Sequence, residues 1–253
     1  MKTLGLCSKD PSAVFSYGTF ARDKVGVQAF FDVLRREMVK ARPAQGHRII
    51  SSLDQSGHLI RHYTLNIDGL ASAAGQTPLV INEEDTKERG GVIELHGNIH
   101  FVVCCVCGTR RPITTLEGLT FRQKRSVRCT QPTCEGEMRF AVVLYGDKDS
   151  GLITPDSVLD YMVQDAASAA VVVWVGISFQ QSASVEYFRR VHRGSGLRRH
   201  VHVVINPEED TLYNLRTGCH GLDLSEHDLV FAQLGAGQGL GVIQRWVRDA
   251  KAT

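Results

Sequence analysis

The chain has 253 residues, of which 43% are hydrophobic and 22% are charged, and its net charge is +2. This composition is ordinary for a globular protein, and the nearly balanced charge gives no whole-chain argument for nucleic-acid binding. Residues 1–10 lack the apolar core of a secretory signal, and the longest apolar run, Ala169–Gly176, is too short to cross a bilayer.

The cysteine content predicts a reducing compartment. Seven cysteines are an odd number, and four of them stand in a metal-like pattern, which argues against a disulfide framework. We therefore expect an intracellular protein, nuclear or cytoplasmic.

Two local clusters of basic residues stand out against the low net charge. They comprise Arg122, Lys124, Arg125 and Arg128, and Arg189, Arg190, Arg193, Arg198 and Arg199. Such clusters are usually solvated faces beside loops, and the alternative is a surface that meets acidic chromatin or a peptide.

The first elements in chain order are helical. Residues 27–40 carry apolar side chains at a helical period, and Pro43 and Gly46 are expected to end this helix. A second helix is predicted over residues 47–53, with Gly57 after its end. Together they give a helical portion near residues 11–56.

Short strands and a different kind of segment follow. Residues 59–65 read as a strand that runs into the loop 66–75, and residues 92–95 form a short apolar stretch. Residues 101–140 are rich in Cys, Arg and Thr and poor in long apolar runs. This change predicts a small lobe whose core does not hold together unaided. Residues 141–145 are apolar again.

The second half of the chain alternates between strands and helices. Residues 170–175 and 201–205 are β-branched runs typical of buried parallel strands, and residues 183–191 have helical spacing. The alternation predicts an α/β fold with a parallel sheet. Ligands of such sheets lie beyond the carboxyl ends of the strands, so we expect the loops ending at Asp68, His96, Ser178 and Asn206 to gather there.

A glycine-rich stretch, Gly235-Ala236-Gly237, follows the apolar residues 229–232. We interpret it as an ordinary turn before a terminal helix over residues 240–250, because a short glycine motif is weak evidence on its own. The alternative is a displaced phosphate-binding loop, as in a permuted chain.

Four cysteines have the spacing of a zinc site. Cys104 and Cys107 form a C-x-x-C pair, and Cys129 and Cys134 form a second, wider pair. Two such knuckles can wrap one tetrahedral Zn²⁺, and four thiolates leave no open position, so the metal would be structural. Free buried thiols are the alternative, and Cys105 could replace a neighbour. We expect ordinary thiols at Cys7 and Cys219.

Several short motifs, taken together, carry a resemblance. Asn66-Ile67-Asp68-Gly69 could by itself be a simple turn. It is followed, however, by Glu94-Leu95-His96-Gly97, the two cysteine pairs, the stretch from Arg139 to Asp147, Gly176-Ile177-Ser178, and Asn206. In this order and spacing the chain resembles the sirtuins from about Phe30 to Asn206.

The resemblance implies a fold, an activity and partners. Sirtuins have an α/β fold, a Rossmann-like parallel sheet with a small inserted zinc-binding lobe. The corresponding domains here are 1–97 with 147–253 for NAD binding and 98–146 for zinc. The implied activity is NAD-dependent protein-lysine deacylation, with NAD as co-substrate and one structural Zn²⁺. The implied partner is an acyl-lysine peptide or protein, such as a histone, with neither a membrane nor nucleic acid.

Roles follow by position from the same resemblance. His96 looks like the general base that takes a proton from a ribose hydroxyl of NAD, a task suited to its pKa near neutrality. Asn66, Ile67 and Asp68 are expected at the nicotinamide end of the cofactor. Gly176, Ser178 and Asn206 are expected on its ribose and phosphate groups. Val143, Tyr145 and Gly146 resemble the segment that pairs with the substrate peptide as an added strand.

The chain departs from the sirtuin pattern at several positions. No Gly-Ala-Gly phosphate loop is found in residues 1–23, and Leu65, Ile177 and Asp147 replace the usual Gln, Thr and Glu. Three hypotheses follow: an active deacylase, a degenerate module that binds peptides or partner proteins without turnover, or a chain whose missing strand lies upstream of Met1.

Overall fold

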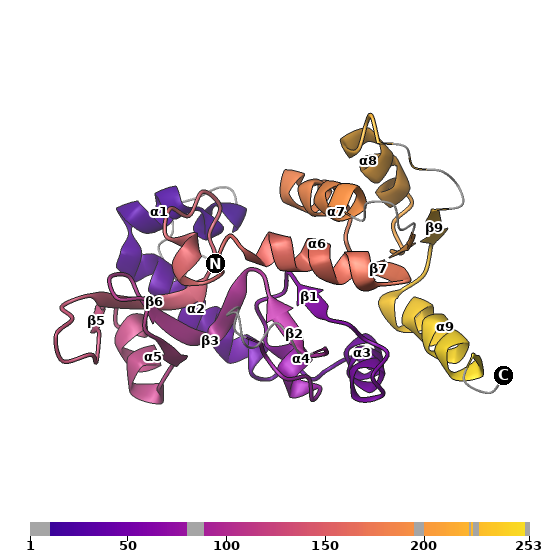
Figure 1. Ribbon diagram of the computed structural model, residues 1–253. Helices are drawn as coiled ribbons and strands as arrows, with labels where there is room; N and C mark the ends of the chain where they lie inside the picture. The colour runs from indigo at the N-terminus through magenta and orange to yellow at the C-terminus, as the bar shows by residue number, and fades with distance from the viewer. Residues whose placement is uncertain (1–10, 80–88, 195–199, 223, 225–227, 251–253) are drawn as a thin grey trace. The chain divides into compact units, whose positions relative to one another are not determined.

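The computed structural model describes residues 11–79, 89–194, 200–222, 224 and 228–250 (Figure 1). Cys7, Arg198, Arg199 and the segment 1–10 lie outside the described residues. The chain divides into two compact units. Unit 1 comprises the described parts of Met1–Arg42, Tyr63–Leu70 and Glu94–Asp156, and unit 2 those of Pro43–His62, Ala71–Ile93 and Ser157–Thr253.

Unit 1 is built on a four-stranded antiparallel sheet in the order β4–β3–β6–β5. Its strands are β3 (Gly97–Cys104), β4 (Arg110–Pro112), β5 (Val127–Arg128) and β6 (Glu137–Val142). The register pairs Gly97 with Val142 and Cys104 with Met138. Because β3 ends where β6 begins, the β3–β4 and β5–β6 turns lie at the same end of the sheet.

Helices pack against this sheet and complete the core of unit 1. They are η2 (Pro11–Phe15), α1 (Tyr17–Arg22), α2 (Lys24–Met38), α5 (Thr115–Arg122) and η3 (Ser150–Leu152). Phe31 of α2 lies 5.9 Å from Phe140 of β6 between ring centroids, and Phe121 of α5 lies 5.2 Å from the same ring. The cysteine-rich segment shares this core with α2.

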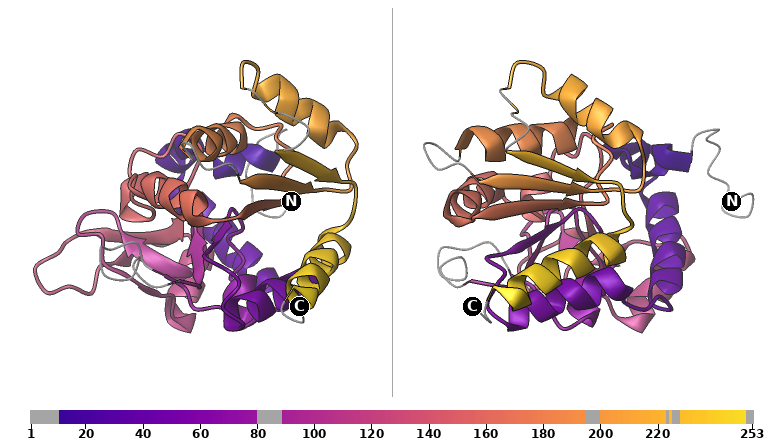
Figure 2. Two further views of the ribbon diagram at one scale, coloured as in Figure 1. Left: turned by 45° about the vertical axis from the view of Figure 1, so that its right-hand side comes forward. Right: turned by 90° about the vertical axis from the view of Figure 1, so that its right-hand side faces the viewer.

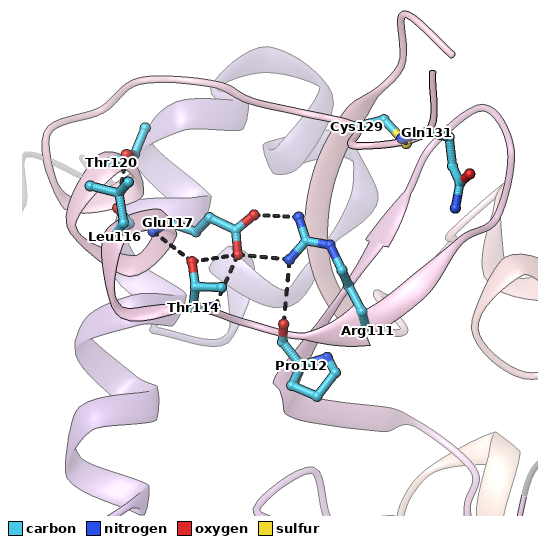
Figure 3. A network of polar contacts seen from close by, with 8 residues as sticks. All are labelled: Arg111, Pro112, Thr114, Leu116, Glu117, Thr120, Cys129 and Gln131. Carbon is cyan, nitrogen blue, oxygen red and sulfur yellow. Dashed lines mark hydrogen bonds and ion pairs between the residues drawn. The ribbon is translucent and has the colours of Figure 1, made fainter. Parts of the chain in front are cut away.

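The amino terminus of α5 shows how the sequence fixes a local element (Figure 3). The Thr114 hydroxyl accepts from the Glu117 backbone N–H at 3.2 Å, and the Glu117 carboxylate accepts from the Thr114 N–H at 2.9 Å. This reciprocal capping box satisfies backbone donors that the first helical turn leaves free. Glu117 also forms an ion pair with Arg111, so the cap ties α5 to β4.

Unit 2 contains a three-stranded parallel sheet in the order β7–β8–β9. Its strands are β7 (Val171–Val175), β8 (Val201–Ile205) and β9 (Leu229–Ala232). Its helices are α3 (Gln45–Gln55), α6 (Val158–Ser168), α7 (Ser182–Gly194), α8 (Asp210–Gly218) and α9 (Ala236–Asp249). The short elements β1 (His62–Thr64), α4 (Leu70–Ala73) and β2 (Val92–Glu94) complete the chain, and β1 pairs with β2.

The two faces of the parallel sheet are covered by different helices. Val203 and Ile205 of β8 share a core with Leu53 of α3 and Leu240 of α9, and these two helices lie side by side in both views of Figure 2. On the other face, His202 of β8 packs against Phe188 of α7, and α7 in turn contacts α6. A parallel sheet covered on both faces requires the continuous apolar strands that the sequence showed.

The sequence placed most elements correctly but missed several boundaries. The first helix runs over Lys24–Met38, and Gly46 lies inside α3 instead of ending the helix before it. The strand expected over residues 59–65 is only His62–Thr64. The expected turn at residues 235–237 is already the start of α9, with Gly235 as N-cap, so the terminal helix begins four residues earlier than predicted.

The predicted fold class is confirmed: an α/β architecture with a Rossmann-type parallel sheet and a clustered cysteine lobe. The domain limits 98–146 and 1–97 with 147–253 stay a prediction. Within the described ranges, no helix combines the length and the apolar character needed to cross a membrane.

Candidate active site and metal centre

His96 lies in the two-residue turn between β2 and β3 in unit 1. The side chain is half-buried, and its burial lowers the pKa of the imidazole below the usual value, while a hydrogen bond with the Leu65 backbone opposes this shift. A lowered pKa keeps the ring neutral at pH 7, which is the state that accepts a proton.

Glycine directly after His96 has a steric reason. Gly97 has φ +78°, and a Cβ there would lie 2.0 Å from the Ala141 carbonyl oxygen of the neighbouring strand. The Val143 N–H also donates to the His96 carbonyl at 3.0 Å. Gly97 therefore lets β3 pass close to β6 immediately beyond the histidine, and the histidine's backbone is fixed by the chain that follows β6.

The loop Asn66–Gly69 is held beside His96 within the same unit. The Leu95 N–H donates to the Thr64 carbonyl at 2.9 Å, and the Ile99 N–H donates to the Ile67 carbonyl at 2.9 Å. Backbone hydrogen bonds therefore tie this loop to the chain just before and just after His96. Asp68 Oδ1 accepts from the Leu70 N–H at 2.9 Å, the local turn that Asx residues favour. Asn66 is exposed. The structure thus brings Asn66, Ile67, Asp68 and His96 together.

A polar network that the sequence did not reveal supports this loop. Glu94 Oε1 accepts from Asn98 Nδ2 at 2.6 Å, and Asn98 Oδ1 accepts from the His100 backbone N–H at 2.8 Å. His100 Nε2 lies 2.9 Å from the Asp68 carbonyl oxygen. Burial raises the pKa of the Glu94 carboxyl, which the Asn98 hydrogen bond opposes. The one sequence signal for this network was the position of Glu94, two residues before His96.

The segment Val143–Gly146 continues from β6 without forming a regular strand. Tyr145 donates its backbone N–H to Phe15 at 2.8 Å and accepts from the Tyr17 N–H at 2.9 Å. Its backbone groups are therefore already engaged, and the exposed parts of Tyr145 and Gly146 are what a peptide would meet.

In unit 2, the other expected cofactor residues lie at the carboxyl edge of the parallel sheet. Gly176 follows β7 with φ +69°, donates its N–H to Ile205 at 2.9 Å, and has open space where a Cβ would be. Ser178 follows it, and its carbonyl accepts from Asn214 at 3.2 Å. Asn206 directly follows β8, is buried, and accepts from the Glu208 N–H at 2.9 Å. These three residues thus follow the carboxyl ends of the adjacent parallel strands β7 and β8.

The glycines of α9 have packing roles. A Cβ on Gly239 would lie 2.5 Å from Ile205 Cγ2, and one on Gly237 would lie 2.9 Å from Gln45 Oε1. Close approach between the helix and β8 therefore accounts for Gly239 without a phosphate ligand, whereas the atom nearest a Cβ on Gly237 is the flexible end of the Gln45 side chain.

Four cysteine side chains converge at the shared end of the unit 1 sheet. The Sγ atoms of Cys104, Cys107, Cys129 and Cys134 all lie within 4.8 Å of one another. Two of the separations are 3.6 Å (Cys104 to Cys134) and 3.7 Å (Cys107 to Cys129). Thiolates about 2.3 Å from a tetrahedral Zn²⁺ stand roughly this far apart. Cys105 is not among the four.

Backbone amides point at these sulfur atoms. Val106 donates to Cys104 at 3.4 Å, Gln131 to Cys129 at 3.5 Å, and Gly136 to Cys134 at 3.4 Å. Such N–H···S contacts stabilise thiolates and orient metal ligands. A Cβ on Gly136 would lie 2.5 Å from Cys104 Sγ, so this turn closes tightly around the sulfur atoms. The donor set and the geometry fit one structural zinc ion.

Comparison with known proteins decides the family. The sequence profile of the Sir2 family matches residues 6–183. The chain belongs to the Sir2 family. The sirtuin resemblance of the short motifs is therefore confirmed, and the cysteine tetrad stands where that resemblance placed a zinc site.

Curated relatives of this sirtuin are enzymes by name. An NAD-dependent protein deacetylase of Cutibacterium acnes is 31% identical over 223 residues, which cover 86% of this chain and 72% of the relative. An NAD-dependent protein deacylase of Caldanaerobacter subterraneus is 29% identical over 213 residues, or 82% and 75% of the two chains.

Solved Sir2 structures share the fold. A Sir2 homologue in complex with NAD superimposes with a TM-score of 0.69 at 22% identity, over 98% of this chain and 81% of the other. Sir2Tm bound to a propionylated peptide gives 0.67 at 18% identity, over 96% and 87%. At this identity the likeness establishes the Sir2 architecture.

Proposed function

We propose that this sirtuin is an NAD-dependent protein-lysine deacylase that produces nicotinamide, deacylated lysine and O-acyl-ADP-ribose. The observation that carries the proposal is the placement of a half-buried His96, with a lowered pKa, beside the Asn66–Asp68 loop. The relatives named as NAD-dependent deacetylases and deacylases support it.

His96 is proposed as the general base. In the reaction the acyl oxygen of the lysine attacks the anomeric carbon of the ribose, nicotinamide leaves, and a ribose hydroxyl then attacks the acyl carbon. A neutral imidazole can take the proton from that hydroxyl, and water completes the release of the lysine amine. The half-buried position of His96 keeps the ring unprotonated before the reaction begins.

Binding roles are proposed for the remaining site residues. Asn66, Ile67 and Asp68 would contact the nicotinamide end of NAD, while Gly176, Ser178 and Asn206 would contact its ribose and phosphate groups. The open space at Gly176 suits a close approach of ligand to backbone. Val143, Tyr145 and Gly146 would bind the acyl-lysine peptide, for which a histone peptide is one candidate to test.

A second function is favoured by two substitutions inside the motifs. Leu65 and Ile177 place apolar side chains where sirtuins carry glutamine and threonine. Charge-assisted and neutral hydrogen bonds to a cofactor contribute about 1–3 kcal/mol each, so a few losses would weaken NAD binding by orders of magnitude. A sirtuin of this kind would bind peptides or partner proteins without turnover.

Calorimetric titration with NAD distinguishes these functions. We expect measurable heat of binding at submillimolar to millimolar NAD, and release of nicotinamide from NAD in the presence of an acetyl-lysine peptide. No heat at millimolar NAD, with retained peptide binding, supports the binding module instead.

The His96→Ala variant tests the assigned base. Because a general base contributes about 10²–10⁴-fold to rate, turnover should fall by at least about 100-fold while NAD still binds. His58→Ala, at an exposed histidine, is the control and should leave turnover unchanged. Turnover that survives in His96→Ala would overturn the assignment.

A further inference from the structure

Two histidine side chains, besides backbone amides, hold the loop of residues 64–68 in unit 1. The Leu65 carbonyl accepts from the His96 imidazole, and the Asp68 carbonyl oxygen lies 2.9 Å from Nε2 of His100. Because a carbonyl oxygen only accepts, the His100 ring carries a proton on Nε2 and donates it to Asp68. The loop therefore rests on two imidazoles at once: the proposed base His96 and a second ring, His100, that belongs to none of the sirtuin motifs.

A chain of hydrogen bonds places the His100 ring against the loop. Glu94 Oε1 accepts from Asn98 Nδ2 at 2.6 Å, and the Asn98 amide oxygen accepts from the His100 backbone N–H at 2.8 Å. The His100 carbonyl accepts from the Ile113 N–H at 3.0 Å. Residues 98–102 leave the regular pairing of β3 with β6, and bulges of this kind re-aim side chains. Both backbone groups of His100 are thus fixed where the bulge turns its ring toward the loop.

Gly69 shows how closely the loop approaches these side chains. Its φ is +70°, and a Cβ there would lie 2.9 Å from His100 Cδ2 and 3.3 Å from Asn98 Nδ2. Asp68 Oδ1 completes the turn by accepting from the Leu70 N–H at 2.9 Å. The end of the loop therefore lies against the His100 ring, and a change at that ring acts directly on Asp68.

The order of this loop also matters for His96. In a neutral imidazole one nitrogen carries a proton and the other accepts one, and the hydrogen bond to the Leu65 carbonyl decides which nitrogen of His96 does which. A fixed carbonyl leaves the second nitrogen unprotonated, as a general base requires. Movement of the loop would therefore disturb both the residues at the nicotinamide end of NAD and the tautomer of the base.

We propose that His100 is a positioning residue of the deacylase reaction: its Nε2–H holds the Asp68 carbonyl and so presents Asn66 and Asp68 to the nicotinamide end of NAD. This inference rests on the proposed function. His100 contributes no atom to the reaction and acts only through the loop. Its loss should therefore weaken NAD binding and turnover by a limited factor, much smaller than the loss expected for His96.

Two substitutions separate the donor from the shape of the ring. His100→Phe keeps a planar ring and removes the Nε2–H, whereas the glutamine of His100→Gln carries an amide N–H close to the position of Nε2. His100→Phe should raise the Kd for NAD about fivefold, the size of one neutral hydrogen bond, and should lower kcat by a similar factor. His100→Gln should stay within about twofold of the unaltered protein on both measures.

The peptide side of the reaction should be insensitive to these changes. Backbone hydrogen bonds with Phe15 and Tyr17 hold Tyr145 in place, and His100 has no part in them. The KM for an acetyl-lysine peptide at saturating NAD should therefore change less than about twofold in either variant. A general loss of structure would raise it together with the Kd for NAD.

Hydrogen–deuterium exchange measures the order of the loop without cofactor. The amides of residues 66–70 should exchange about fivefold faster in His100→Phe and at the original rate in His100→Gln. The amides of β6 should keep their rates, which shows that the variant is folded. His58→Phe, the same change at an exposed histidine of unit 2, is the control and should alter neither exchange nor NAD binding.

One measurement needs no variant. Two-bond correlation of the ring protons and nitrogens of ¹⁵N-labelled histidine reports which nitrogen is protonated. His100 should carry its proton on Nε2 at neutral pH. A ring protonated only on Nδ1 has no donor for the Asp68 carbonyl and would overturn the proposal, even if His100→Phe fails to fold.

The outcomes distinguish this role from the proposed function. Absence of NAD binding and of nicotinamide release in the unaltered protein defeats the deacylase function, and with it any role of His100 toward NAD. If the unaltered protein binds NAD, an unchanged loop exchange or an unchanged NAD affinity in His100→Phe overturns the positioning role alone. Equal defects in His100→Phe and His100→Gln also overturn it, because the N–H would then not be the group that matters. Faster exchange and weaker NAD binding in His100→Phe, both restored in His100→Gln, support it.

Discussion

At the scale of single residues, the environment of His96 predicts the pH dependence of the reaction. Burial lowers the pKa of this imidazole, so it stays neutral, and able to accept a proton, at pH values below the usual 6.5. We expect kcat/KM to fall with decreasing pH through a midpoint under 6.5. The pH–rate profile checks this, and an acid limb centred above 6.5 would contradict the assigned base or its burial.

A cluster of three histidines in unit 2 contains two further rings, His200 and His202, whose pKa burial lowers. His202 is 1% exposed, its Nδ1 accepts from Trp174 Nε1 at 3.1 Å, and its Nε2 lies 3.3 Å from His192 Nδ1. His200 is buried beside it, and neither of its ring nitrogens has a hydrogen-bond partner in the described part of the chain. Burial and then the neighbouring histidines lower the pKa of His202 to about 3. The His202 ring is therefore neutral in the folded chain at pH 7.

This cluster predicts that unit 2 loses stability in mild acid. The pKa of His202 is lower in the folded than in the unfolded chain, so between pH 6.5 and about 3 the unfolded chain binds more protons, and stability falls as pH falls. With an unfolded pKa near 6.5, the loss from pH 7 to pH 5 is about 2 kcal/mol. Urea unfolding at the two pH values measures it.

Substitution of His200 tests the origin of that loss. His200→Phe removes two buried unsatisfied nitrogens and one titrating ring, so it should raise stability and reduce its dependence on pH. His220→Phe, at an exposed histidine, is the control and should leave the dependence unchanged. Since His202 remains in this variant, part of the loss should persist; an undiminished loss would show that His200 does not contribute to it.

At the scale of elements, the cysteines tie two hairpins together. Cys104 and Cys107 flank the β3–β4 turn, and Cys129 and Cys134 flank the β5–β6 turn. β5 has only two residues and β4 only three, so each edge strand is held to the sheet over a short length. A metal bound to all four thiolates would cross-link the two turns.

Metal analysis of single variants tests this role. We expect about one zinc per chain in the purified protein, loss of that zinc in Cys104→Ser, and full retention in the neighbouring Cys105→Ser. Circular dichroism should show reduced thermal stability in Cys104→Ser alone. Equal zinc contents in the two variants would refute the ligand set.

The elements also show what a sequence can and cannot predict. β7 and β8 could be predicted because an uninterrupted run of β-branched residues is typical of a buried parallel strand. The cysteine tetrad could be predicted because tetrahedral metal binding restricts the spacing of its ligands along the chain. β6 begins with Glu137 and includes the buried Arg139, whose charge hides the strand pattern. Its burial depends on Asp147 and Phe20, contacts that no local pattern contains.

The candidate site shows the same limit. His96 and the Asn66–Asp68 loop were found through motifs, but Glu94, Asn98 and His100 support that loop through hydrogen bonds that only the bulged path of β3 creates. Likewise, His192, His200 and His202 meet only because α7 packs on β8. Residue type and spacing predict the groups that the chemistry requires. The groups that position them come close only through packing, which a local pattern does not show.

At the scale of the whole molecule, each unit has its own hydrophobic core and its own group of residues that responds to solution conditions: the cysteine tetrad in unit 1 and the histidine cluster in unit 2. The core of unit 1 joins α2 to the antiparallel sheet and lies next to the cysteine tetrad. The core of unit 2 joins α3 and α9 to the parallel sheet, whose other face carries the histidine cluster. Chains with separate cores commonly depart from two-state unfolding.

We therefore predict two calorimetric transitions that respond to different treatments. A zinc chelator at pH 7 should lower the midpoint of the unit 1 transition by several degrees, because the thiolates lose their common ligand. A change from pH 7 to pH 5 should lower the unit 2 transition, because neutral His202 must be protonated on unfolding. His200→Phe should weaken the second response and leave the first intact, and Cys104→Ser should remove the first and leave the second. One transition that both treatments shift equally would mean that the two cores unfold as a single cooperative body.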